Sequence, residues 1–370
     1  MKIALFHNFM DNIGGAEVVT LTLARELDAD VYTTNIDEEK IKKMGFADVI
    51  PRINSIGKIP VRAPFRQQLA FWKFRRLNLG KKYEFYIISG DWAMSGAVNN
   101  KPNLWYVHSP LNELWQFKDY IKKELVVWWK RPIFETWVQF NRMLTLRYAK
   151  HVGVWVCNSK NTQQRIKKFY KQNAEIAHPP IETKKFRPEE SKGYWLSVNR
   201  IVAHKRIEIQ TEAFSKLPEE ELVVVGSYEQ GAEQFENYKH TVEKGMTSNV
   251  KMIHWADSEE LQSLYAGCKG FVVTSKDEDF GMTAVEAMAS GKPVIAPNEG
   301  GYMETVIDGK TGILIDDMNG DKLASTIKAL SAKLNNPDDQ QAFEKNCLAR
   351  AKEFDTSVFI KKIVSLVKPS

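Results

Sequence analysis

Short apolar runs alternate with longer amphipathic segments along most of this chain. Residues 3–7 form the first apolar run, and residues 16–27 follow it with the 3.6-residue spacing of a helix. Further runs that predict strands lie at residues 86–89, 104–108 and 152–157. Strands that alternate with helices favour parallel sheets with helices on both faces, so the pattern predicts a doubly wound α/β fold.

The alternation breaks at residues 178–193, where three prolines stand among many charged residues. It restarts with the strand-like run 194–198. We therefore predict an N-terminal domain over residues 1–177, a linker over 178–193 and a C-terminal domain over 194–354. A length of 370 residues suits two domains of ordinary size.

Composition narrows the class of protein. Apolar residues make up 43% of the chain, which is enough for packed cores, but no apolar run reaches the roughly 18 residues of a membrane-spanning helix. The first residues read directly as a strand and lack the layout of a signal peptide. Cys157, Cys268 and Cys347 are scattered, with neither a disulfide frame nor a metal-binding spacing. We expect a cytoplasmic protein with reduced thiols.

The net charge of +6 is concentrated in one segment. Residues 49–83 contain no Asp or Glu, and their basic residues are Arg52, Lys58, Arg62, Arg66, Lys73, Arg75, Arg76, Lys81 and Lys82. Aromatic residues lie between these cations, as suits contact with an anionic membrane surface through residues 52–82. A solvated helix that covers its own domain is the alternative, and a nucleic-acid partner is not expected. A second, Trp-rich stretch at residues 126–137 is either an interfacial belt or ordinary helix packing.

The stretch from Ser275 to Gly291 holds the clearest candidate chemistry. The apolar run 271–273 predicts a buried strand, and residues 282–290 predict a helix that Gly291 ends. The turn between them directs backbone N–H groups and the positive end of the helix dipole at the edge of a sheet, which suits a phosphate. Glu278 precedes this helix and Glu286 lies one turn inside it, so the two carboxylates can contact different parts of one extended ligand. This arrangement describes a site for a nucleotide sugar.

The spacing of Glu278 and Glu286, with seven residues between them, resembles the motif of retaining glycosyltransferases of family 4. The resemblance extends over essentially the whole chain, through residues 14–17, 106–110, 197–205, 223–226, 300–304 and 308–312. It implies the GT-B fold, in which two Rossmann-like domains face a central cleft. The first domain then binds the acceptor and the second binds the nucleotide-sugar donor. A C-terminal helix within residues 355–370 is expected to cross back to the first domain.

The resemblance also implies roles for individual residues of the second domain. Arg200 and Lys205 are expected to stabilise the diphosphate leaving group without a metal. Glu286 is expected to bind the ribose hydroxyls, and Glu278 to bind hydroxyls of the transferred sugar. The cradle for phosphate and sugar comprises the backbone groups of Phe280, Gly281, Met282 and Thr283. Asn199 stands where the family usually has glycine.

In the first domain, His108 follows an apolar strand and resembles the active-site histidine of the family. Gly14 and Gly15, expected among the donor-binding residues, would let the first loop approach the diphosphate or the acceptor closely, while Glu17 either caps its own helix or touches ligand. The pairs Asp28-Ala-Asp30 and Asp277-Glu-Asp279 match a metal-binding pattern that is common by chance. We therefore expect no metal and no cofactor. The expected mechanism is front-face, with the leaving phosphate oxygen accepting the proton of the acceptor hydroxyl.

Residues 106–110, with Leu111 and Trp115, resemble mannosyltransferases that use GDP-mannose to build surface polysaccharide or lipid-linked oligosaccharide. We predict transfer of a sugar, mannose as the first hypothesis, to a glycan or lipid-linked acceptor. A UDP-sugar transferase of the same family and a nucleotide-sugar epimerase with the GT-B fold are the alternatives. A non-catalytic scaffold that binds glycan or nucleotide is disfavoured by the complete set of charged residues.

Overall fold

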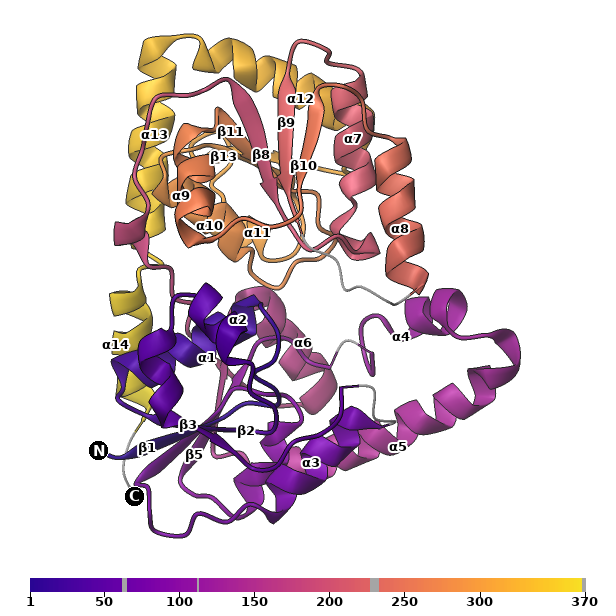
Figure 1. Ribbon diagram of the computed structural model, residues 1–370, viewed down its shortest axis with the longest axis vertical. Helices are drawn as coiled ribbons and strands as arrows, with labels where there is room; N and C mark the ends of the chain where they lie inside the picture. The colour runs from indigo at the N-terminus through magenta and orange to yellow at the C-terminus, as the bar shows by residue number, and fades with distance from the viewer. Residues whose placement is uncertain (62–64, 112, 227–232, 368–370) are drawn as a thin grey trace. The chain divides into compact units, whose positions relative to one another are not determined.

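The computed structural model describes residues 1–61, 65–111, 113–226 and 233–367 (Figure 1). The chain divides into two compact units. The first comprises Met1–Pro180 together with the chain from Phe359 onward, and the second comprises Ile181–Val358. Each unit contains one sheet in which every described strand pair is parallel. The predicted α/β class, with two Rossmann-like parallel sheets, is therefore confirmed.

The sheet of the first unit has seven strands in the order β3-β2-β1-β4-β5-β6-β7. These strands are β1 (Ile3–Phe6), β2 (Asp30–Thr33), β3 (Ile53–Ser55), β4 (Phe85–Ile88), β5 (Asn103–Val107), β6 (Val154–Cys157) and β7 (Glu175–Ile176). All residues of β1, β4 and β5 are buried, because helices cover both faces of the sheet centre. The order reverses between β1 and β4, and ligands bind at the carboxyl ends of the strands that flank such a reversal.

Helices connect these strands, and the chain returns to this unit at its end. The helices are α1 (Gly15–Glu26), α2 (Glu38–Lys43), α3 (Arg66–Arg76), α4 (Lys118–Tyr120), α5 (Arg131–Ala149) and α6 (Lys160–Tyr170), with shorter turns η1 (Ala47–Arg52), η2 (Ala93–Val98), η3 (Ile121–Leu125) and η4 (Trp128–Lys130). From Phe359 onward, α14 (Thr356–Leu366) belongs to the first unit. The ring of Phe359 packs edge-on against that of Tyr106 in β5, with centroids 5.6 Å apart.

The sheet of the second unit repeats the same spatial order, β10-β9-β8-β11-β12-β13. Its strands are β8 (Tyr194–Val198), β9 (Glu221–Val225), β10 (Val250–Ile253), β11 (Gly270–Val272), β12 (Val294–Pro297) and β13 (Gly312–Ile315). Its helices are η5 (Thr183–Lys185), η6 (Ala203–Lys205), α7 (Ile207–Ser215), α8 (Glu233–Lys244), α9 (Ser258–Gly267), α10 (Met282–Ala289), α11 (Tyr302–Thr305), α12 (Gly320–Leu334) and α13 (Pro337–Lys352). The reversal lies between β8 and β11.

The strands of the second sheet alternate their side chains between two hydrophobic cores. Leu196 and Phe271 belong to the core on one face, while Trp195 and Val272 belong to the core on the other. This two-residue period is that of extended strands buried on both faces.

Most of the predicted linker, residues 178–193, packs within the second unit. The boundary lies at Ile181, whose side chain is buried in a core of that unit. The backbone N–H of Ile181 donates to the carbonyl of Phe354 (3.0 Å), and the Thr183 hydroxyl donates to Asp355 (2.5 Å). The prolines and charges of this segment indicate exposed chain, but one apolar residue and these hydrogen bonds attach it to the second unit.

Candidate functional site

In the second unit, the predicted site residues lie at the carboxyl ends of β8 and β11, where the strand order reverses. Asn199 follows β8 and is buried, and its side-chain amide donates to Ser197 Oγ (2.7 Å). Among the described residues, Asn199 is absent from those with positive φ, so this loop does not need glycine at that position. The departure from the family pattern is therefore accommodated without backbone strain.

The loop after β8 is attached to the end of β11 by several hydrogen bonds. Thr274, which is fully buried, donates its hydroxyl proton toward the carbonyl of Lys205 (2.7 Å). Arg206 Nε donates to the carbonyl of Thr274 (2.6 Å), and the N–H of Lys276 donates to the carbonyl of His204 (2.8 Å). The backbone that carries Lys205 is thus positioned by the strand end across the reversal.

Lys205 and Glu278 form an ion pair at this edge, with Nζ 2.6 Å from Oε2. The side chains are 14% and 21% exposed, so the pair is largely shielded from water. Burial raises the pKa of Glu278, but the charge and hydrogen bond of Lys205 outweigh it, and the pKa lies below its usual value. Two residues expected at different parts of a ligand are therefore in direct contact.

Three glycines allow two loops to pack closely at the start of α10. Gly281 has φ +89°, and a Cβ there would lie 2.6 Å from the ring of Tyr302. A Cβ on Gly300 would lie 2.6 Å from the carbonyl oxygen of Glu278, and the N–H of Gly301 donates to that same oxygen (2.7 Å). The turn before α10 is thus fixed by the Gly300-Gly301 turn. It presents the N-terminal N–H groups of α10, including those of Met282 and Thr283, at the positive end of the helix dipole.

Glu286 lies within α10 and is partly buried. Its Oε2 accepts a hydrogen bond from the hydroxyl of Tyr265 in α9 (2.8 Å). Burial raises the pKa of Glu286, and the bond from Tyr265 only partly opposes this effect. Tyr265 was not predicted as a site residue, because a buried tyrosine on an amphipathic helix gives no signal in sequence beyond core packing.

The remaining predicted cation, Arg200, is exposed to solvent. In the part of the chain that the structure describes, Arg200 forms no ion pair, whereas Arg206 pairs with Glu299. Arg206 and Glu299 were also missed in sequence, although Arg206 directly follows Lys205. His204 is partly buried, and burial together with the charge of Lys205 lowers its pKa to about 4.

In the first unit, His108 ends a chain of polar groups at the carboxyl ends of β1, β4 and β5. His108 Nε2 lies 2.8 Å from Ser89 Oγ, and Ser89 Oγ lies 2.6 Å from Thr20 Oγ1. Thr20 Oγ1 lies 3.2 Å from His7 Nδ1, and His7 Nε2 lies 3.7 Å from Glu17 Oε1. The order of strands explains the meeting, because His7 and Ser89 follow the two strands that flank the reversal.

The hydroxyl groups determine the tautomer of His108. Thr20 donates its single hydroxyl proton to the carbonyl of Ala16 (2.8 Å), so Ser89 must donate its proton to Thr20. Ser89 can then only accept from His108, which assigns the proton of the imidazole to Nε2. Burial and the neighbouring His7 lower the pKa of His108 to about 3, so the ring is neutral near pH 7. Its Nδ1 is then left as a hydrogen-bond acceptor.

The absence of a side chain at Gly14 leaves room for the carboxylate of Glu17. Gly14 precedes α1 in an extended conformation, and a Cβ there would lie 2.7 Å from Glu17 Oε2. Burial raises the pKa of Glu17, but the adjacent His7 imidazole lowers it below its usual value. The Glu17 side chain is therefore largely buried and faces His7. Gly15, the first residue of α1, lies at the same loop.

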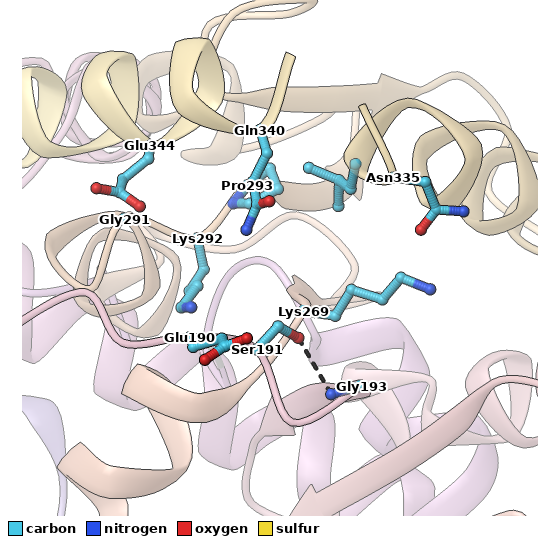
Figure 2. A pocket seen from close by; sticks show the side chains of 11 residues that line it. Glu190, Ser191, Gly193, Lys269, Gly291, Lys292, Pro293, Asn335, Gln340 and Glu344 are labelled. Carbon is cyan, nitrogen blue, oxygen red and sulfur yellow. Dashed lines mark hydrogen bonds between the residues drawn. The ribbon is translucent and has the colours of Figure 1, made fainter. Parts of the chain in front are cut away.

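A pocket elsewhere in the second unit is distinct from this site (Figure 2). It lies at the amino ends of the strands, since Gly193 directly precedes β8, and Lys269 and Pro293 directly precede β11 and β12. The buried Lys292 extends toward the linker segment and donates to the carbonyl of Glu189 (2.8 Å). Since the predicted site residues follow the strands, this pocket lies at the opposite end of the sheet from them.

The predicted membrane contact and the predicted absence of a metal both remain predictions. No described helix is long and apolar enough to cross a membrane. Asp28 is paired with Arg52, and Asp30 accepts from the hydroxyl of Tyr83 (2.5 Å). No group of three or more His, Cys, Asp or Glu residues in the described ranges is arranged to hold a metal ion. Independence of metal remains a prediction.

Comparison with known proteins agrees with the geometry. Residues 180–348 match the family model of glycosyl transferases group 1. The chain is 34% identical over 166 residues to the alpha-1,3/1,6-mannosyltransferase ALG2 of Dictyostelium discoideum, which is 39% of each chain. It is 27% identical over 199 residues to an uncharacterized glycosyltransferase of Methanocaldococcus jannaschii, which is 54% of each. The matched region thus spans between two fifths and about half of the length of these relatives.

Solved structures extend the likeness in fold to the whole chain. HepE of Anabaena in complex with UDP and glucose has a TM-score of 0.75 at 17% identity, over 99% of both chains. Sucrose-phosphate synthase of Thermosynechococcus elongatus has a TM-score of 0.76 at 19% identity, over 99% of this chain and 98% of that one. The fold is therefore GT-B. Residues 180–348 are thus similar to group 1 glycosyl transferases, and the whole chain shares its fold with solved glycosyltransferase structures.

Proposed function

We propose that this protein transfers a sugar from a nucleoside-diphosphate sugar to a glycan or lipid-linked acceptor, with retention of anomeric configuration. The observation that carries the proposal is the shielded Lys205–Glu278 pair beside the N-terminus of α10, within the segment that matches group 1 glycosyl transferases. A cation, a carboxylate and a helix N-terminus supply complementary groups for a diphosphate and for sugar hydroxyls.

The reaction needs stabilisation of negative charge on the leaving diphosphate. Lys205 is already oriented by Glu278 and by the loop contacts with Thr274, so little reorganisation is required when charge develops. Arg200 is proposed to supply a second cation, since its exposed guanidinium is available to a ligand. These groups replace a metal in the proposed mechanism, in which neither metal nor other cofactor takes part.

Glu278 is proposed to bind hydroxyls of the transferred sugar, and Glu286 to bind the ribose. The backbone groups of Phe280, Gly281, Met282 and Thr283 are proposed to cradle phosphate and sugar. His108 is proposed to accept a hydrogen bond from a sugar hydroxyl at Nδ1. In the front-face mechanism, the oxygen of the acceptor hydroxyl bonds to the anomeric carbon while the bond from that carbon to the diphosphate breaks. An oxygen of the leaving phosphate accepts the proton of the acceptor hydroxyl.

GDP-mannose is our first choice of donor. The similarity to the mannosyltransferase ALG2 and to the mannosylfructose-phosphate synthase of Agrobacterium fabrum supports it. A UDP-sugar is the second candidate, because HepE was solved in complex with UDP-glucose. We place the reaction in the synthesis of surface polysaccharide or glycolipid on the cytoplasmic side of a membrane.

Calorimetric titration with GDP and with UDP, each with and without EDTA, tests the donor site. Binding of GDP in preference to UDP, unchanged by EDTA, is the expected result. Preference for UDP would overturn the mannose assignment alone, and loss of binding in EDTA would overturn the metal-free one. Failure to bind either nucleotide would contradict the proposed function. Product analysis with GDP-mannose then separates transfer, which forms a glycoside, from epimerisation, which leaves an isomeric nucleotide sugar.

A further inference from the structure

An aromatic tip occupies the segment between α4 and α5 of the first unit. Figure 1 shows α4 and the start of α5 extending away from the sheet of that unit. Val127, Trp128 and Trp129 lie at η4, at the start of α5, and are 54%, 75% and 57% exposed. Adjacent exposed tryptophans are costly in water and point to a partner that covers them.

The apolar surface continues along α5. Ile133, Phe140 and Met143 are 66%, 52% and 61% exposed, and their spacing of seven and then three residues places them on one side of the helix. The opposite side of α5 packs on its own unit, where Arg142 donates from Nε to the carbonyl of Leu114 (2.7 Å). The side of α5 that carries Arg142 therefore packs against its own unit, while the side with the exposed apolar residues faces solvent.

A second exposed row lies on α3, which contacts α5. Phe65, Leu69 and Trp72 are 65%, 44% and 42% exposed and follow the helical spacing of four and then three residues. The two helices are joined by a hydrogen bond from Gln68 Nε2 to Asn141 Oδ1 (3.1 Å) and by the rings of Phe71 and Tyr148.

The charge around these rows is strongly positive. Between residues 118 and 150 the sequence has eight Lys and Arg but three Asp and Glu. All three acidic residues pair with lysines of the same segment, so five cations are left in excess. Lys123 is largely exposed, and Lys130 Nζ lies 4.8 Å from the ring centroid of Trp129. Residues 49–83, which include α3, add nine cations and no acidic residue.

Residues 52–82 were predicted to contact a membrane, but several of their cations bond to groups of their own unit. Arg66 pairs with Asp11, Arg52 pairs with Asp28, and Lys73 donates to the carbonyl of Ile56 (3.5 Å), so part of the basic set stabilises its own unit. Arg62 lies outside the described residues. The most exposed tryptophans belong instead to the Trp-rich stretch at residues 126–137, for which the sequence left interfacial contact and helix packing open.

We propose that η4 and the exposed side of α5 insert into the headgroup region of an anionic lipid bilayer, with α3 beside them. Tryptophans with apolar neighbours suit the membrane interface, and the surrounding cations suit its negative surface potential. A protein partner is less consistent with these residues, because lysine is depleted at protein interfaces. The proposal concerns binding alone and stands independently of the sugar that is transferred.

Co-sedimentation of the full chain with vesicles tests the proposal. Vesicles of phosphatidylcholine with about a third phosphatidylglycerol are compared with pure phosphatidylcholine at low salt. We expect the double variant Trp128→Ala/Trp129→Ala to lower the partition coefficient at least tenfold. Trp255→Ala is the matched control, since Trp255 is 42% exposed in the second unit, and it should leave partitioning unchanged. The variant Lys123→Gln/Lys130→Gln should lose part of the binding to anionic vesicles, and added salt should reduce this difference.

Equal partitioning of wild type and the tryptophan variant would overturn the proposal, as would equal binding to neutral and anionic vesicles. A wild-type dimer that dissociates on Trp128→Ala/Trp129→Ala, measured by sedimentation velocity without lipid, would assign the surface to a second copy instead. Circular dichroism is expected to show unchanged folding, because both side chains are exposed. Nucleotide titration of the same variant separates this proposal from the proposed function, which predicts unchanged binding.

Discussion

Lys205 Nζ lies 2.6 Å from Glu278 Oε2, and about four fifths or more of each side chain is shielded from solvent. The pair joins the loop after β8 to the turn after β11 across the reversal of strand order. Each residue therefore compensates the buried charge of the other, and each is held where a ligand at the start of α10 would meet it. Structure and proposed catalysis depend on the same two side chains.

Removal of either charge should destabilise the second unit. Lys205→Met removes the cation that compensates the shielded Glu278 carboxylate, and we expect a loss of about 1–3 kcal/mol in the free energy of unfolding. The double variant Lys205→Met/Glu278→Leu should recover much of it, which a double-mutant cycle in urea would measure. The exposed pair Lys251–Glu221, with side chains 64% and 42% exposed, is the control and should contribute less than about 1 kcal/mol. Additive effects at Lys205 and Glu278 would contradict the coupling.

Substitutions of Arg200 and Lys205 should differ in their effect on stability but have the same effect on activity. Arg200→Ala should leave the unfolding midpoint unchanged, since Arg200 is exposed, whereas Lys205→Ala should lower it. Both should slow transfer by about 100-fold or more if both cations stabilise the leaving diphosphate. Initial rates with saturating donor, with melting curves on the same samples, check both statements. Full turnover by Arg200→Ala would contradict its assignment.

The sequence predicted this edge of the second unit closely. Helix α10 was predicted as residues 282–290 and spans Met282–Ala289, and the glycine predicted to end it, Gly291, has φ +74°. Periodicity and glycine placement suffice there, because the strand, turn and helix are consecutive in the chain. The contact of Lys205 with Glu278 was not predicted, since 73 residues separate them and their meeting depends on the order of strands.

The series of hydrogen-bonded polar residues that ends at His108 could not be predicted from the sequence for the same reason. His108 was predicted, but His7, Thr20 and Ser89 come from different segments and carry no local motif. One signal was available: His7 and Ser89 each follow an apolar strand directly. A sheet order of Rossmann type, assumed from the resemblance, would have placed both at the reversal beside His108.

Tyr265 should tune nucleotide binding through Glu286. Tyr265→Phe removes the hydrogen bond that favours the ionised carboxylate, so the pKa of Glu286, already raised by burial, should rise further. A protonated Glu286 is a poorer acceptor for ribose hydroxyls, so we expect the loss of binding on acidification to begin at a higher pH in Tyr265→Phe than in wild type. Calorimetric titration over a series of pH values measures this difference. Glu286→Gln, which cannot titrate, should bind weakly and without the pH dependence.

His108 should make stability depend on pH below neutrality. Its pKa in the folded protein is about 3, below the usual 6.5, so the unfolded chain binds more protons between these values. Its contribution is therefore fully present above about pH 6.5 and is lost as the pH falls toward 3. His204, with a pKa of about 4, acts in the same direction. His108→Gln should flatten the unfolding midpoint between pH 4 and 7 relative to wild type, and His204→Gln should do so less.

This pH dependence requires a neutral His108 ring, and nitrogen NMR of the histidine side chains supplies the control. A protonated Nε2 and an unprotonated Nδ1 should persist from pH 5 to 8, as the bonds among Thr20, Ser89 and His108 require. Ser89→Ala removes the acceptor for Nε2–H and should allow both tautomers. Retention of a single tautomer in this variant would show that Ser89 does not position the ring.

A side chain at Gly281 should destabilise the protein for two reasons, backbone strain and a steric clash, and these two costs can be measured separately. Its φ of +89° strains any L residue, and a Cβ would also lie 2.6 Å from the ring of Tyr302. Gly309, with φ +70° and no atom within 4 Å of where a Cβ would lie, carries only the first of these costs. Gly309→Ala should therefore lose about 1 kcal/mol of stability, and Gly281→Ala distinctly more, about 2–4 kcal/mol, because Tyr302 is buried and cannot move away. Since Gly281 directly precedes α10 as its N-cap residue, Gly281→Ala should weaken nucleotide binding while Gly309→Ala should not. Equal losses in urea unfolding would show that backbone strain alone explains the glycine.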